Sequence, residues 1–417
     1  MQTDTETSPS GFMAPLRHRS FALFQTAKFL ASLATQIQTV AVGAQVYSLT
    51  HRPLDLGIVG LSQFLPFLLF VMPAGQAADH YDRRRLLLLC FAVELVCGAA
   101  LLWFTASGMR APWPVFAIMV AFGVARAFSA PADSALLPNL VPRELFGNAI
   151  GINSTAWQFS VIAGPALGGL LYASHGAGAA YLTVIALLIV SLVCLWFVRS
   201  PPQAAPTGAA TLHTLLEGLR FVRSRPVILC AISLDLFAVL LGGATAMLPA
   251  YASDVLHVGA GGLGWLRASP GIGAALVAVL LSVRPITRQV GPMMFSGVLV
   301  FGIATVLFGL STNYAWSLLL LAVLGAADMI SVFVRHMLVQ LETQDSMRGR
   351  VGAVNSMFIG ASNELGEFES GLMATWLGLV PSVALGGVLT VLVVIGCAAL
   401  FPVLRRMDRF PDMHPGD

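Results

Sequence analysis

Gly123–Ser154 reads GVARAFSAPADSALLPNLVPRELFGNAIGINS, and Gly325–Ser356 reads GAADMISVFVRHMLVQLETQDSMRGRVGAVNS. The two stretches align without a gap at a spacing of 202 residues (325 − 123), which brings Asn153 onto Asn355. A match of this kind indicates an internal duplication, in which each half of the chain forms one copy of the same unit. Two six-helix repeats are a known plan for membrane transporters.

The composition requires that much of the chain contacts lipid. Of the 417 residues, 57% are hydrophobic and 10% are charged, and the mean hydropathy is +0.82. Soluble domains carry about a quarter charged residues, so this chain cannot cover a soluble globule with polar groups. The formal net charge of +3 is too small to argue for nucleic acid as a partner. The five cysteines lie in apolar runs without metal-ligand spacing, and we interpret them as buried apolar side chains.

Twelve apolar segments have the length of about 20 residues that crosses a bilayer as a helix. They lie at 21–48, 56–78, 86–107, 114–137, 147–173, 178–198, 226–250, 260–283, 291–311, 314–338, 350–377 and 381–404. The segments are too long and too continuously apolar for strands. The expected fold class is therefore an all-α membrane protein, with twelve transmembrane helices in two pseudo-symmetric six-helix bundles.

The longest connection divides the chain into its two halves. It begins with RSPPQAAPTGAA and continues as TLHTLLEGLRFVRS, which predicts an amphipathic helix on the membrane surface. The expected units are a cytoplasmic tail (1–20), a first bundle (21–198), a linker with this helix (199–225), a second bundle (226–404) and a cytoplasmic tail (405–417). Arg and Lys concentrate in one set of loops, and the opposite set holds only Arg52 and Arg110, which predicts that both termini are cytoplasmic.

Charged residues within the apolar segments occupy equivalent positions of the two halves with opposite signs. The aligned positions are Arg126 with Asp328 and Asp133 with Arg335 at the spacing of 202 residues, and Lys28 with Asp235 at a second spacing of 207 (235 − 28). Facing one another, such residues would form ion bridges that differ between two conformations, because ionisable groups at membrane depth commonly mark pathways. The alternative is a set of static bridges or of charges that reach the membrane surface, and the positions of Asp133 and Arg335 near helix ends suit it.

The segment GQAADHYDRRR resembles the signature loop of the major facilitator superfamily, Gly-x-x-x-Asp-Arg-x-Gly-Arg-Arg. The matching positions are Gly75, Asp79, Arg83 and Arg84, whereas His80 and Asp82 depart from the pattern. The resemblance implies a fold of two six-helix bundles around a central cavity. It also implies a cytoplasmic latch, in which Asp79 engages the arginines and the start of the eleventh helix.

Two further motifs resemble those of the same superfamily. Arg126 in GVARAF is similar to a buried arginine of the fourth helix, which is implicated in proton movement in proton-coupled members. GINSTAWQFSVIAGPALGG resembles the antiporter motif at Gly151, Gly164, Pro165, Gly168 and Gly169, while Ser160 replaces a glycine. NSMFIGASNELGEFESG and ALLPNLVPRE resemble the branch that includes the enterobactin exporter and related efflux proteins.

These resemblances imply a secondary active transporter of the inner membrane that exports a small organic molecule, such as a siderophore, drug or metabolite, by alternating access. The expected driving ion is H⁺, with no cofactor, and a monomer is the default state of the superfamily. No nucleotide-binding loop or catalytic motif is present, so we expect no enzyme. One alternative is a metal-cation carrier that uses Glu364, Glu367, Asn363 and His336, and another is a membrane sensor or assembly factor without transport.

Three carboxylates interrupt the eleventh apolar segment in the sequence ASNELGEFESG. A single charge at the middle of a bilayer is disfavoured by roughly 3 kcal/mol. Glu364 and Glu367 are three residues apart and share one helical face, whereas Glu369 lies on a different face. The expected pathway residues are therefore Lys28, Arg126, Asp235 and Asp328, followed by Glu364 and Glu367.

Overall fold

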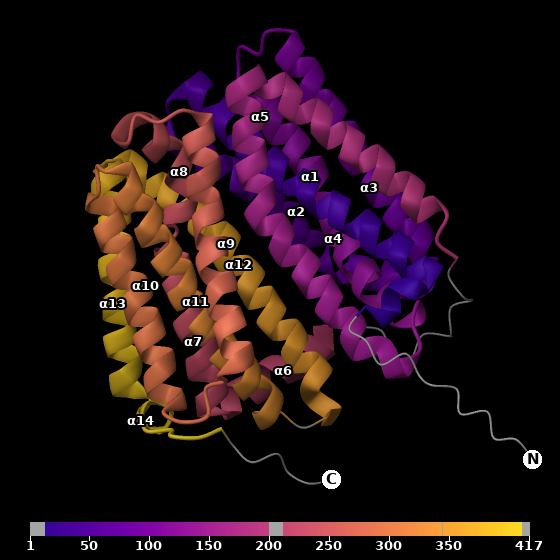
Figure 1. Ribbon diagram of the computed structural model, residues 1–417. Coiled ribbons are helices and arrows are strands. Elements are labelled where there is room, and N and C mark those ends of the chain that lie inside the picture. Colours follow the sequence, from indigo (N-terminus) through magenta and orange to yellow (C-terminus); the bar gives the residue numbers. More distant parts are fainter. Residues whose placement is uncertain (1–12, 200–211, 344, 411–417) are drawn as a thin grey trace, which may run out of the picture.

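The computed structural model describes residues 13–199, 212–343 and 345–410, and this part of the chain is almost entirely helical (Figure 1). The long apolar runs form helices because a helix satisfies its own backbone hydrogen bonds in lipid. The first half contains α1 (Arg19–Thr50), α2 (Pro53–His80), α3 (Arg83–Ala106), α4 (Trp113–Leu136) and α5 (Phe146–Trp196). The 51-residue α5 turns at Gly176, whose φ of 79° is readily reached only by glycine, and so forms two helical legs.

The second half contains a further set of long helices, one of which is broken. They are α7 (Pro226–Leu241), α9 (Ala260–Val283), α10 (Val290–Leu310), α11 (Tyr314–Glu342), α12 (Asp345–Leu377), α13 (Leu379–Leu400) and the short α14 (Pro402–Arg405). After Gly242 and Gly243 the path of α7 continues through short turns, which are η4 (Ala244–Met247), α8 (Leu248–Ala250) and η5 (Tyr251–Val255).

The helices account for the twelve predicted membrane crossings. In the described part, ten helices are long and apolar enough to span a bilayer. One of these is α5, which supplies two crossings because it reverses at Gly176. The twelfth is α12, which has 33 residues and also carries the carboxylates of ASNELGEFESG. It packs between α2 of the first half and α7 of the second, so protein rather than lipid surrounds much of it.

The two halves meet through two contacts that the internal repeat makes equivalent. A Cβ added to Gly371 of α12 would lie 3.1 Å from the Cα of Gly57 in α2. A Cβ added to Gly264 of α9 would lie 2.9 Å from the Cα of Gly169 in α5. The repeat relates these glycines, since Gly371 follows Gly169 by 202 residues and Gly264 follows Gly57 by 207. The absence of side chains lets both helix pairs approach closely.

A hydrophobic cluster joins the halves at the side of the molecule where α8 lies, at the top of Figure 1. It combines Val40, Tyr47 and Leu56 of the first half with Met247 and Tyr251 of the second. The α6 and α14 helices lie at the opposite side (Figure 1). Separate apolar cores fill the interior of each half. The structure therefore has one side on which apolar packing seals the halves together.

The predicted amphipathic helix is present as α6 (Leu212–Ser224), but it lies against the protein. Its Val222 is 2% exposed and packs in a cluster with Ile228 and Val351. Glu217 of α6 forms a salt bridge with Arg350 of α12 at 2.7 Å. Part of the predicted face, Leu216 and Leu219, is exposed. The helix thus packs on the second half, and the Pro- and Ala-rich stretch 200–211 before it lies outside the described residues.

Candidate functional site

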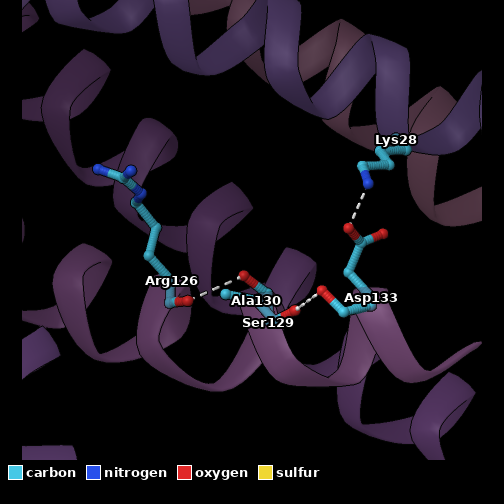
Figure 2. Close-up of polar contacts among 6 residues, drawn as sticks. Lys28, Arg126, Ser129, Ala130 and Asp133 are labelled. Atoms are coloured by element: carbon cyan, nitrogen blue, oxygen red, sulfur yellow. Dashed lines mark hydrogen bonds and ion pairs between the residues drawn. The ribbon is translucent and has the colours of Figure 1, made fainter. Parts of the chain in front are cut away.

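An ion pair joins α1 and α4 within the first half. Lys28 donates a hydrogen bond from Nζ to the Asp133 carboxylate, and the two side chains are 22% and 21% exposed. Figure 2 shows the two side chains approaching each other from their separate helices. Arg126 lies two turns before Asp133 on α4, and its side chain extends in a different direction (Figure 2).

An equivalent ion pair joins α7 and α11 within the second half. Arg335 donates from Nη1 to the Asp235 carboxylate, and these side chains are 3% and 6% exposed. Asp328 lies two turns before Arg335 on α11, within electrostatic range of both members of the pair. The second half therefore brings together two carboxylates and one guanidinium, of which Asp235 and Arg335 are buried and Asp328 is partly exposed.

The internal repeat relates these two bridges and reverses their polarity. Lys28 is equivalent to Asp235, and Asp133 is equivalent to Arg335, so the cation stands on the first helix of one bridge and on the fourth helix of the other. Sequence alone suggested that equivalent residues would face one another. In this structure Lys28 and Asp235 instead pair with Asp133 and Arg335 of their own halves, because the first and fourth helices of a half lie together at this level.

The Glu367 carboxylate of the second half packs against Gly60 of the first half. A Cβ added to Gly60 of α2 would lie 2.6 Å from Oε2 of Glu367 in α12. Arg267 of α9 and Glu367 line the same small cavity, of about 30 Å³, together with Gln38 and Gln63 of the first half. The charge of Arg267 acts on Glu367, and that of Arg126 acts on it more weakly. Glu367 thus lies at the boundary between the halves, among cations from both.

Arg126 lies close to two acidic groups from different helices. Its charge acts on Glu94 of α3, which is 4% exposed, and on Glu367 of α12. It also lines a cavity of about 60 Å³ with Gln63 and Gly360. The guanidinium is therefore positioned between α2, α4 and α12, where the halves meet.

Arg267 and Glu94 were not among the residues predicted from the sequence. Both are single charges inside apolar segments, in GWLRASPG and FAVELVCG, so the signal that identified Arg126 was present for them as well. Their equivalent positions in the other half carry no charge, since Arg267 aligns with Gly60 at the spacing of 207. A comparison that looks for opposite charges at equivalent positions therefore does not identify Arg267 or Glu94.

The remaining carboxylates of α12 and the predicted metal ligands are not gathered into one site. The Glu364 side chain lies outside the described part of the structure. Glu369 is partly exposed on the same helix. Asn363 donates to the backbone carbonyl of Ile359 at 2.8 Å, and His336 is exposed on α11. Among the described residues, no group of three or more His, Cys, Asp or Glu side chains is arranged to hold a metal ion.

The residues of the antiporter motif place α5 against α1 and α9. A Cβ added to Gly168 would lie 3.1 Å from the Cα of Ile37 in α1. Gly169 faces Gly264 of α9, and the carbonyl of Pro165 lies 2.6 Å from the position of a Cβ on Gly264. Gly164 also faces α1, and Gly151 lies near the start of α5. Gly164, Gly168 and Gly169 therefore set the approach of α5 to a helix of each half.

The arginines of the signature loop bind carbonyl groups at helix ends within the first half. Arg83 donates from Nη1 to the carbonyl of Ala135 in α4 at 2.9 Å. Arg84 donates to the carbonyls of Leu195, at 3.1 Å, and Trp196 in α5. Cations at these positions complement the helix dipoles. A Cβ added to Gly75 would meet nothing within 4 Å, so packing does not require a glycine there in this conformation.

A hydrogen bond closes the sealed side of the molecule. The Tyr47 hydroxyl of α1 donates to the carboxylate of Asp254 in η5, and the two residues are 207 apart in sequence. This is also the spacing that relates Lys28 to Asp235, so the repeat makes Tyr47 and Asp254 equivalent positions. Equivalent residues that touch lie on the pseudo-twofold axis between the halves. The Tyr47–Asp254 contact therefore marks that axis at the sealed side.

The sequence matches a described family over almost its whole length. Residues 10–415 match the family of transmembrane secretion effectors within the major facilitator superfamily. The enterobactin exporter EntS of Citrobacter koseri is 25% identical over 403 residues, which are 96% of this chain and 96% of that protein. EntS of Escherichia coli O81 (strain ED1a) is 25% identical over 402 residues, or 95% of each chain.

Solved transporters have the same fold. A bacterial homologue of the human lysosomal transporter Spinster, in an inward-facing and unoccupied conformation, superposes with a TM-score of 0.73 at 16% identity. The superposition covers 96% of this chain and 99% of that one. A POT family transporter in complex with a thioalcohol-conjugated peptide gives a TM-score of 0.74 at 12% identity, over 93% of this chain and 96% of that one. Both comparisons support the two-bundle architecture.

Proposed function

Because the chain belongs to the transmembrane secretion effector family of the major facilitator superfamily, we propose that it exports a small organic molecule in exchange for protons. The family and the matched relatives are transporters, so the chain is a multi-pass membrane transporter and not an enzyme. We place it in the inner membrane as a monomer, with both termini cytoplasmic, in agreement with the arginine distribution. The bundles 21–198 and 226–404 would then rock against each other around the charges at their boundary, Glu367, Arg267 and Arg126.

Glu367 carries the proposal of proton coupling. Its carboxylate is seated on Gly60 of the other half, within range of Arg267 and Arg126. A change in the relative position of the halves must therefore change the surroundings of this carboxylate. A proton on Glu367 would remove its charge and weaken its attraction to both cations, which would alter the balance between the two arrangements of the bundles.

The other buried charges have supporting roles in this proposal. Lys28, Asp133, Asp235 and Arg335 would hold the first and fourth helices of each half together, and Asp328 would line the path beside them. Gly75, Asp79, Arg83 and Arg84 would belong to the cytoplasmic gate. The name of the EntS relatives supports a siderophore as the first substrate to test. A lipophilic drug or metabolite would be tested beside it as the alternative substrate.

The test uses everted membrane vesicles with an acidic interior, in which export appears as uptake. We expect uptake of a catecholate siderophore that a proton uncoupler abolishes. Glu367→Gln should reduce proton-driven uptake to the background, whereas Glu369→Gln, two residues along the same helix, should retain most of it. Full uncoupler-sensitive uptake by Glu367→Gln would exclude Glu367 as the coupling group. Equal uptake with and without the uncoupler would exclude protons as the driving ion.

A further inference from the structure

An apolar groove lies at the end of the first half that is nearest the signature loop. It has a volume of about 500 Å³ and is formed by α3 and α4 with the end of α2. Its walls include Leu86, Leu89 and Val93 of α3 with Val124 and Phe128 of α4. Leu89 is 63% exposed, and α3 lies on the flank remote from the second half (Figure 1). The groove therefore opens toward the hydrocarbon of the bilayer.

The mouth of this groove holds a cation that has no partner among the described residues, the guanidinium of Arg85. Three arginines follow one another at the start of α3, and two of them bind helix carbonyls, as described above for Arg83 and Arg84. Arg85 is exposed and lines the groove, and within the described part of the chain its guanidinium has no hydrogen bond or ion pair. The backbone N–H of Arg85 donates to the Asp82 carboxylate at 2.8 Å, and this bond does not involve the guanidinium.

The Asp82 carboxylate also lies at the mouth of the groove. It caps the N-terminus of α3 by accepting the Arg85 N–H, and the positive end of the helix dipole offsets its charge there. The Arg85 guanidinium is therefore the group available to an incoming ligand. A guanidinium presents donors in a geometry that fits phosphate.

We propose that this groove binds one phospholipid of the bilayer, with the phosphate on Arg85 and an acyl chain along Leu86, Leu89 and Val93. The cation at the membrane surface matches the lipid phosphate, and the apolar groove matches an acyl chain. Basic pockets between transmembrane helices are known to bind lipid head groups. The site is separate from the charges between the halves. The neighbouring arginines Arg84 and Arg85 would then have different tasks, since Arg84 binds helix carbonyls and Arg85 binds the lipid phosphate.

The test measures lipid retention by the purified full-length protein, so it does not depend on transport. Phosphatidylglycerol, or a diacylglycerol with the same chains, is added in mild detergent and bound lipid is counted by native mass spectrometry. We expect the wild type to retain one phosphatidylglycerol and little diacylglycerol. Arg85→Gln should weaken retention of phosphatidylglycerol about fivefold, the contribution typical of one arginine near an anionic surface.

Two further variants complete the test. Arg405→Gln removes an exposed arginine of α14 and should retain phosphatidylglycerol as the wild type does. Val124→Trp should fill the groove and lower retention, with the melting temperature measured to establish that the variant is folded. Unchanged retention in both Arg85→Gln and Val124→Trp would overturn the proposal. Equal retention of diacylglycerol and phosphatidylglycerol by the wild type would overturn it as well, since the phosphate would then make no contact.

Discussion

At the scale of single residues, the Asp235–Arg335 pair is nearly removed from solvent, with side chains 6% and 3% exposed. Removing one partner leaves the other charge buried without a counter-ion, which typically destabilises a protein by about 3–5 kcal/mol. We expect Asp235→Ala to lower the thermal unfolding temperature of the detergent-solubilised protein clearly. Asp133→Ala should have a smaller effect, because the Lys28–Asp133 pair is about one-fifth exposed and water can screen the charge that remains.

The reversed polarity of the two bridges permits a stricter experiment. Asp235→Lys should be strongly destabilising, since it places two cations together in the interior of the second half. Adding Arg335→Asp to it recreates the arrangement that Lys28 and Asp133 adopt at the equivalent site, so we expect the double variant to recover much of the lost melting temperature. A double variant no more stable than Asp235→Lys alone would show that the bridges are not interchangeable.

Most of the charges within the helices could be predicted from the sequence, but their partners could not. Lys28 and Asp235 stand out because each is an ionisable group in an apolar segment. Their pairing with Asp133 and Arg335 depends on which helices are neighbours, and a repeat spacing shows equivalence but not contact. Tyr47 escaped notice for a different reason: a tyrosine in an apolar helix is common, and only the fold brings it to Asp254.

At the scale of helices, the boundaries were predictable because the length of each apolar run is set by the thickness of the bilayer. The break after Leu241 was harder to predict, since a glycine pair such as Gly242–Gly243 also occurs inside an intact helix, as Gly386–Gly387 does in α13. The position of α6 relative to the membrane surface stays a prediction. Its amphipathic pattern indicates one apolar face, but the pattern is the same whether that face meets lipid or, as for Val222, the neighbouring helices.

The α5–α9 contact can be tested with a methyl group. A Cβ at Gly169 would lie 2.5 Å from the carbonyl oxygen of Ala260 and 2.6 Å from the Cα of Gly264. Both neighbours are backbone, so the helices must separate, and overpacking of this kind costs about 1–3 kcal/mol. We expect Gly169→Ala to lower the melting temperature. The matched control is Gly147→Ala in the same helix, where a Cβ meets nothing within 4 Å, and it should unfold at or above the wild-type temperature. Equal melting temperatures for the two variants would contradict the close contact.

At the scale of the whole molecule, the duplication explains why the halves meet as they do. The α2–α12 and α5–α9 contacts are copies of each other, and Tyr47 meets its own equivalent, Asp254, on the axis between them. The same symmetry does not extend to the central charges, because Arg267 stands where the first half has Gly60. That asymmetry gives Glu367 a notch on one side and a cation on the other. The duplication thus accounts for the paired contacts between the halves, whereas the charges of Arg267 and Glu367 have no charged counterpart at the equivalent positions, Gly60 and Pro165.

The Tyr47–Asp254 hydrogen bond must break whenever the sealed side opens. A hydrogen bond to a charged group contributes about 1.5–3 kcal/mol, so Tyr47→Phe should raise the population open at that side by roughly 10- to 100-fold relative to the closed one. Spin labels on Arg110→Cys and Thr312→Cys, which lie in exposed loops of different halves, report the separation by double electron–electron resonance. We expect a longer distance to gain population in Tyr47→Phe but not in the neighbouring control Ser253→Ala. If the two variants gave the same distance distribution, the hydrogen bond would not control the opening of this side.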